Sequence, residues 1–349
     1  MGFVARSAAA SIAMNWAFVG EPLQALHWSE VERKHTNHSG LLAPLVRTSG
    51  LVAQILTALD TLDLDVALTL LNDMGDSSGT EELWAFTIYT HSQCALANNN
   101  PFAAWTMLRR AIATHSHQHT ATAFSAPLLK ATEIDLLLAL GEGNAATAAA
   151  TDITDPGNNP WTLTSVARLQ QRIGQNDTAL ALCHQFTWAV ESYPRLYMEV
   201  LLIQAVAHSE LGQSQFAAQA WLKACTIADQ TRLLSTFSTI SREDIDTLDH
   251  IAATDSRALA EFCAAHRSAI FPRSVHIVTL TKREQVVLEL LARRMSTPAI
   301  ARTLYISVNT VKTQLRHLYR KLDVHNRNDA IIRAHALKLL RQLPPATPT

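Results

Sequence analysis

The sequence predicts an all-α protein, in which an N-terminal α-solenoid of helical hairpins precedes a small four-helix domain with a helix-turn-helix. Three observations lead to this prediction. A helix break followed five residues later by a small residue recurs over the first 230 residues. Near the carboxyl end, two amphipathic helices flank a short turn. The charge is also divided: residues from Arg273 onward carry 14 Lys and Arg against 4 Asp and Glu, whereas the preceding residues carry 15 against 26.

The amino end has the composition of a helix. Residues 1–20 combine one arginine with an apolar run, as a signal peptide does, but Asn15 and several serines and alanines dilute the run. No stretch approaches the roughly 18 apolar residues that a membrane span needs. The four cysteines lie far apart without a CxxC pair, which is typical of reduced, buried thiols. We therefore expect a cytoplasmic protein that does not enter a membrane.

The repeat is the main feature of the first domain. Its breaks and small residues are Gly20/Ala25, Leu62/Ala67, Asn98/Ala103, Gly141/Ala146, Gly174/Ala179 and Gly212/Ala217, at intervals of 42, 36, 43, 33 and 38 residues. Such intervals are close to the period of tetratricopeptide-type hairpins, and a small residue lets two paired helices approach closely. The pattern predicts an irregular, tetratricopeptide-like solenoid over residues 1–270, acidic and suited to sensing or protein contact.

The domain boundary follows from the loss of this pattern. Residues 242–266 indicate two more short helices, and Phe271-Pro272-Arg273 marks the boundary. A second domain is predicted for residues 274–341. The proline-rich end, 342–349, is expected to be a disordered tail.

Four helices are predicted in the second domain. Thr281 and Glu284 form a capping box that begins the first helix, and Ser307 is an N-cap for the third. Residues Leu304 to Ser307 separate the second and third helices. A fourth helix is expected from Asn328 to Leu340, and its apolar face exceeds what so small a domain covers.

The third helix, 307–322, has two different faces. Its inner arc collects Val308, Val311, Leu315, Leu318, Tyr319 and Leu322. The neighbouring arc collects Asn309, Lys312, Thr313, Arg316 and Arg320. Long cations beside short polar groups suit a groove lined with phosphates and acceptor-rich guanine edges, although an isolated basic helix is more often a solvated surface.

The stretch from Leu280 to Ala334 resembles the LuxR-type helix-turn-helix domain of bacterial transcription regulators. The resemblance rests on the LTxRE opening, on Ile306-Ser307-Val308-Asn309-Thr310-Val311-Lys312-Thr313 and on Tyr319-Arg320-Lys321-Leu322. It implies that Lys312, Thr313 and Arg316 face the bases. It also implies that Ser307, Thr310, Lys321 and Arg327 lie near phosphates or brace the fold, and that the last helix makes a dimer contact through Ala330, Ile331 and Ala334. Arg294, Ala299 and Asp323 depart from the family pattern without removing a DNA contact.

The solenoid resembles, more weakly, the helical segments that precede such domains in maltose-regulator-like activators. Those larger regulators carry a GxxxxGK[ST] nucleotide loop, whereas this chain has no Gly-Lys dipeptide. We therefore expect no cofactor. His115, His117 and His119 have HxHxH spacing, but alternate residues of a helix point about 200° apart, which favours a solvated loop over a metal site.

We expect a sequence-specific transcription regulator, with activation favoured over repression, and not an enzyme. Its expected partners are double-stranded DNA, RNA polymerase, a second copy on DNA and an effector on the solenoid, either a small molecule or a protein. One alternative is a solenoid scaffold whose basic end binds nucleic acid without sequence preference. Another is a sigma-factor region, although the fourth helix with Arg327 and Ala330 favours the LuxR type.

Overall fold

The structure is a computed structural model of the 349-residue chain, and it describes residues 2–35, 43–75, 83–115, 125–189 and 192–340. Within these ranges the chain is helical and has no β-strand, which confirms the all-α prediction. The chain divides into two compact units, Met1–Gly141 with Ala149–Val275 and Glu142–Ala148 with His276–Thr349. The predicted tail, 342–349, lies outside the described residues. No helix in the described part is long and apolar enough to cross a membrane.

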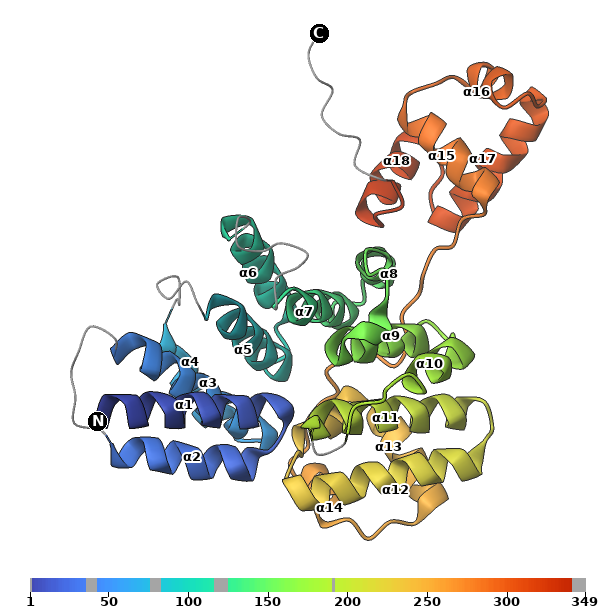
Figure 1. Cartoon of the computed structure of the whole chain (residues 1–349). Helices are drawn as coiled ribbons and strands as arrows, with labels where there is room; N and C mark the ends of the chain where they lie inside the picture. Colours follow the sequence, from blue (N-terminus) through green and yellow to red (C-terminus); the bar gives the residue numbers. More distant parts are fainter. Residues whose placement is uncertain (1, 36–42, 76–82, 116–124, 190–191, 341–349) are drawn as a thin grey trace. The chain divides into compact units, whose positions relative to one another are not determined.

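Unit 1 consists of successive helical hairpins (Figure 1). The helices are α1 (Gly2–Val19), α2 (Pro22–Lys34), α3 (Ala43–Asp60), α4 (Leu64–Met74), α5 (Trp84–Ala97), α6 (Pro101–Thr114), α7 (Ala126–Ala139), α8 (Gly143–Thr151), α9 (Pro160–Arg172), α10 (Asn176–Cys183), α11 (Pro194–Glu210) and α12 (Ser214–Thr231). Helix α8 spans the division between the units, because its residues 143–148 group with unit 2. The sequence had placed that segment in the first domain.

The turns explain the repeat seen in the sequence. Five predicted breaks, at Gly20, Leu62, Gly141, Gly174 and Gly212, have φ between 66° and 99°, and the alanine five residues after each is fully buried. The third pair was predicted one residue too early. Asn99, with φ of 53°, ends α5 instead of Asn98, and Ala104 is buried where Ala103 is exposed. Asparagine tolerates the left-handed region, so either residue could have ended the helix.

The odd-numbered helices of unit 1 pack in series, since α1 contacts α3, α3 contacts α5, and so on to α11. Helix α11 also contacts α1, so the row returns to its start (Figure 1). Arg195 of α11 makes this closure. Its guanidinium donates to both carboxylate oxygens of Asp60 at 2.6 and 2.7 Å and to the carbonyl of Ala17 at 2.9 Å. A Cβ at Gly20 would lie 2.6 Å from Cβ of Arg195, so this turn requires glycine for its space as well as its φ.

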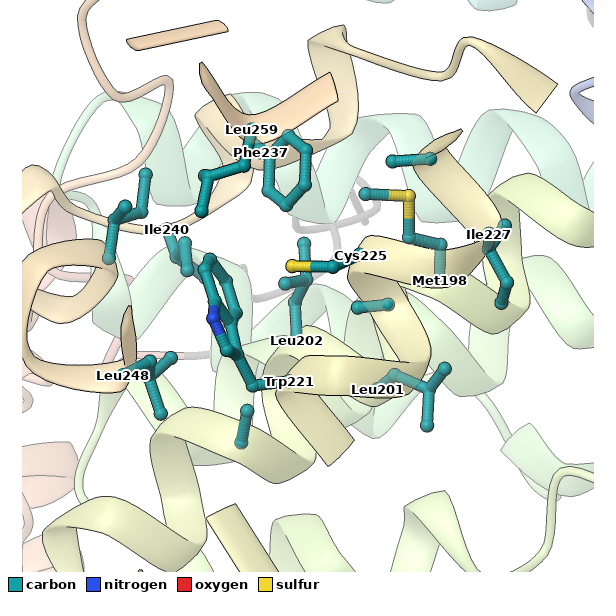
Figure 2. Packing of buried hydrophobic residues seen from close by; sticks show 14 of the residues in the cluster. Met198, Leu201, Leu202, Trp221, Cys225, Ile227, Phe237, Ile240, Leu248 and Leu259 are labelled. Carbon is teal, nitrogen blue, oxygen red and sulfur yellow. The ribbon is translucent and has the colours of Figure 1, made fainter. Parts of the chain in front are cut away.

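The carboxyl-terminal part of unit 1 has the largest apolar cluster, shown in Figure 2. Trp221 of α12 is fully buried, and its ring lies 5.7 Å from that of Phe237. Phe237 belongs to the short helix η3 (Ser235–Thr239), which α13 (Arg242–Ala252) and α14 (Arg257–Ala264) follow. These two helices confirm the prediction for residues 242–266. They pack against the apolar cluster that α11 and α12 share, and a segment outside any helix, from Arg267 to Val275, follows them.

Unit 2 contains α15 (Lys282–Ala292), α16 (Thr297–Thr303), α17 (Val308–Leu322) and α18 (Arg327–Ala336). Its core is apolar and contiguous, and includes Val287, Leu288, Leu291, Ile300, Val311, Leu318, Leu322, Ala330 and Ala334. The predicted fourth helix was too long at its carboxyl end. It ends at Ala336 because Lys338 adopts a left-handed φ of 53°.

Candidate nucleic-acid interface

Helix α15 begins at the predicted capping box. The hydroxyl of Thr281 accepts from the amide of Glu284 at 3.2 Å, and the carboxylate of Glu284 accepts from the amide of Thr281 at 2.8 Å. The same carboxylate accepts from the ammonium of Lys321 at 2.7 Å. Burial alone would raise the pKa of Glu284, but the hydrogen bonds from Lys321 and Thr281 outweigh it and lower this pKa. Lys321 therefore joins the end of α17 to the start of α15.

The turn between α16 and α17 is tight. Ser296 caps α16, with Pro298 at its second position, and Tyr305 takes a left-handed φ of 54°. The amide of Ile306 then donates back to the carbonyl of Ala301 at 3.0 Å, which turns the chain toward α17. The side chain of Tyr305 is 96% exposed beside the start of α17. Sequence reasoning did not single out this residue, although an aromatic side chain in a short turn is the signal for it.

Ser307 caps the start of α17, as predicted. The hydroxyl of Ser307 accepts from the amide of Thr310 at 3.0 Å and lies 2.8 Å from its hydroxyl. Most of the predicted inner arc is buried, namely Val311, Leu315, Leu318 and Leu322, with Tyr319 half-buried. Val308 was assigned to this face incorrectly, because it is 38% exposed in the first turn, where the arc has not yet reached the core.

The outer face of α17 carries the predicted polar stripe. Asn309, Thr310, Lys312, Thr313, Arg316 and Arg320 are all exposed. Among the residues that the structure describes, none forms an ion pair with Lys312, Arg316 or Arg320. These three cations line an open hollow of about 560 Å³ whose floor includes Leu315 and Tyr319. Unpaired cations at this spacing are suited to bind phosphate and base edges.

Two residues of the predicted DNA-contact set have structural partners instead. Arg327 donates from Nη2 to the carbonyl of Leu291 at 2.8 Å and from Nη1 to that of Met295 at 2.9 Å, so it caps the carboxyl end of α15. Lys321 is held by Glu284, and it also donates to the carbonyl of Thr279 at 3.0 Å. The sequence implied that Arg327 and Lys321 either lie near phosphates or brace the fold, and in the structure both brace the fold.

The predicted dimer contact needs a correction within α18. Ala330 and Ala334 are fully buried in the core of unit 2, so their side chains cannot reach a second molecule, and Ile331 is half-buried against the same core. The apolar side chain that α18 exposes is Ile332, at 68%. The helical period allowed either face to be the inner one, and only the packed domain distinguishes them.

No group of three His, Cys, Asp or Glu side chains that could hold a metal ion occurs in the described part of the chain. His115 ends α6, and its ring stacks on Trp84 at 4.5 Å between centroids. His117 and His119 lie outside the described residues.

Comparison with known proteins identifies the helix-turn-helix. Residues 278–334 match the family described as bacterial regulatory proteins, luxR family. The chain is 40% identical over 76 residues to the probable csgAB operon transcriptional regulatory protein of Salmonella typhimurium and 38% identical over 76 residues to the CsgBAC operon transcriptional regulatory protein of Escherichia coli. These matches span 22% of this chain and 35% of each relative.

A further relative is the HTH-type transcriptional regulator MalT of Vibrio campbellii, which is 41% identical over 66 residues, 19% of this chain and 7% of that protein. The chain thus covers about a third or less of the length of these relatives. No solved structure matches the chain.

Proposed function

We propose that this chain, whose carboxyl-terminal domain is a LuxR-family helix-turn-helix domain, is a sequence-specific DNA-binding transcription regulator. The observation that carries the proposal is the stripe of exposed, unpaired cations on α17, the second helix of the helix-turn-helix. A helix in this position reads the major groove in helix-turn-helix proteins. The relatives named above are transcription regulators by their own descriptions, which supports this function over an enzymatic one.

The residues divide by what they could touch. Lys312 and Thr313 lie just over one turn into α17 and Arg316 lies a turn further on, and these three would contact base edges. Arg320 lies one more turn along and would contact a phosphate. Ser307, Asn309 and Thr310 stand at the positive end of the helix dipole, where a phosphate is favoured. The basic charge of the domain, +10 from Arg273 onward, would strengthen binding to any DNA. Specificity would therefore depend on the few base-facing side chains.

Selection from random DNA tests this function. We expect the full chain to enrich one motif, and an oligonucleotide with that motif to bind at least about 10³-fold more tightly than a scrambled one at physiological salt. Binding to both should weaken steeply as salt rises, because phosphate contacts release counterions. Equal affinity for the motif and the scrambled sequence would instead favour a scaffold that binds nucleic acid without sequence preference.

Dimeric binding is part of the proposal, through the exposed face of α18. An Ile332→Glu substitution would place like charges across a two-fold contact, and should weaken binding to an operator with two half-sites far more than to one half-site. Thermal stability should be unchanged, because Ile332 packs little in the monomer. The matched substitution Ala334→Glu puts a charge into the core and should unfold the domain. A folded Ile332→Glu chain that binds the full operator like wild type would exclude this contact.

The remaining partners are proposed from the same function. A regulator of this type acts on chromosomal DNA in the cytoplasm and communicates with RNA polymerase. Unit 1 would receive the regulatory signal, since the residues before Arg273 carry a net charge of −11 and a charge of that sign disfavours DNA binding. Activation remains favoured over repression.

A further inference from the structure

Unit 1 contains a buried charge cluster that the DNA-binding function does not use. Arg168 of α9 is 3% exposed, and its Nη1 lies 2.5 Å from the carboxylate of Asp135 on α7 while its Nη2 pairs with Glu199 on α11. Ser165 also donates to Asp135 at 3.0 Å. Burial raises the pKa of both carboxyls, although the charge of Arg168 opposes this. Buried ion pairs seldom stabilise a fold more than apolar side chains of similar volume would.

The cluster is covered by a peptide segment of the chain itself. From Arg267 to Val275 the backbone belongs to no helix, and it bends at Ile270, Phe271 and Arg273. Phe271 is 4% exposed, and its ring lies 4.8 Å from the guanidinium carbon of Arg168. Beside the ring remains a small cavity of about 40 Å³, which Tyr89, Trp161, Asp135 and Glu199 help to line. The ring therefore covers a charged site without filling it.

Few backbone contacts hold this segment. The amide of Ile270 donates to the carbonyl of Ser238 at 2.7 Å, and that of Val275 donates to the carbonyl of Arg172 at 2.9 Å. Phe271 and Val275 are buried, whereas Ser268, Ala269 and Ser274 between and beside them are exposed. The two buried side chains are four positions apart and anchor the segment, as side-chain pockets anchor a docked peptide.

Arg172 is a second, independent sign of a ligand site. It is 1% exposed, and no carboxylate lies within ion-pair distance among the described residues. Its guanidinium donates only to the carbonyls of Arg273 at 3.1 Å and Thr239 at 2.6 Å, and its Nε has no partner. Burial lowers the pKa of Arg172 to about 10. One of the two carbonyls that Arg172 binds, that of Arg273, thus belongs to the segment Arg267–Val275.

The charge around the segment selects its chemistry. Arg273 pairs through Nη1 with Glu243 at 2.5 Å and through Nε with Asp244 at 3.2 Å. The segment thus has three consecutive features: the ring of Phe271 on the guanidinium of Arg168, then Pro272, then Arg273 paired with two carboxylates. Together they form a compact recognition pattern. A peptide of another protein with the same three features would contact the same side chains of unit 1.

We propose that the surface of unit 1 around Arg168 and Arg172 is a peptide-binding site, that residues Arg267–Val275 occupy it as an internal ligand, and that it accepts in their place an aromatic-proline-basic segment of a partner protein. Because Val275 directly precedes the helix-turn-helix domain, occupation by a partner frees the connection to that domain. The proposal concerns peptide binding and stands independently of DNA recognition.

A labelled peptide with the sequence of residues 267–275, RSAIFPRSV, tests the site on the full chain. Phe271→Ala should weaken the internal ligand, so we expect this variant to bind the peptide about tenfold or more tightly than wild type, in which the internal segment competes at high effective concentration. A control peptide with alanine in place of phenylalanine should not bind either chain. Fluorescence anisotropy measures both.

A second variant keeps the test decisive if Phe271→Ala does not fold. Arg273→Glu changes a half-exposed side chain and repels Glu243 and Asp244, so it should release the segment without opening the core, and should also bind the wild-type peptide more tightly than the unchanged chain does. Circular dichroism confirms folding. The proposal would be overturned if the folded Phe271→Ala or Arg273→Glu chain did not bind the peptide, or bound the phenylalanine and alanine peptides equally.

Discussion

Replacing Asp60 with alanine is expected to lower the free energy of unfolding of unit 1 by about 3–5 kcal/mol. Asp60 is fully buried, and its carboxylate accepts two hydrogen bonds from Arg195 and one from Ser235 at 3.0 Å. Burial alone would lower the pKa of Arg195, but the charge of Asp60 outweighs it and raises this pKa. Without Asp60 the guanidinium would remain buried, charged and without its anionic partner.

Tryptophan fluorescence during urea unfolding measures this effect, because all seven tryptophans lie between Trp16 and Trp221 and so report on unit 1 alone. Asp246→Ala is the matched control: it removes an exposed carboxylate that pairs with Arg242 at 3.2 Å, and should change stability by less than about 1 kcal/mol. If both substitutions had equally small effects, the Asp60 pair would not hold the two ends of the helical row together.

Alanine at Lys312 or Arg316 should cost about 1–3 kcal/mol of specific binding, or roughly 5- to 150-fold in affinity for the selected motif. Both side chains are exposed on α17 and lack an ion-pair partner among the described residues, so their removal leaves the domain fold intact. Binding to scrambled DNA should weaken much less. Electrophoretic mobility shifts with both oligonucleotides at one salt concentration give the ratio.

Lys321→Met is the matched control for these substitutions. It removes a cation from the same helix, but one that is bound to Glu284, so we expect a lower melting temperature of unit 2 with an unchanged ratio of specific to non-specific affinity. If Lys312→Ala and Lys321→Met lowered that ratio equally, the assignment of Lys312 to base contact would be wrong.

Helix caps could be predicted from the sequence because each depends on residues only a few positions apart. The capping box at Thr281, the N-cap at Ser307 and the left-handed Asp323 after α17 each depend on a neighbour two to four positions away. The exposed stripe of α17 followed from the helical period alone. The stretch from Ile306 to Thr313 also resembles a known family, so the position of this stripe was predictable from the sequence.

The other features depend on contacts between distant residues. Whether Ala330 or Ile332 faces the core of unit 2 is decided by packing against α15 and α17, and α15 lies far from α18 in sequence. The pairing of Asp60 with Arg195 and the burial of Phe271 against Arg168 likewise join separate hairpins, and no local pattern distinguishes these charges from solvated ones. The sequence could not decide whether Asn98 or Asn99 takes the left-handed conformation at the third turn, because two adjacent asparagines satisfy the same pattern.

The contact of α11 with α1 affects the order in which the protein can be completed on the ribosome. In an open solenoid each repeat rests only on its neighbours, so early repeats can fold as they emerge. Here Asp60 and Arg195 are 135 positions apart, and a nascent chain that does not yet include Arg195 exposes a carboxylate and a glycine turn that contact α11 in the folded protein. We expect such a large sequence separation to slow the final step of folding, and the first hairpins expose aggregation-prone surface until α11 is synthesised.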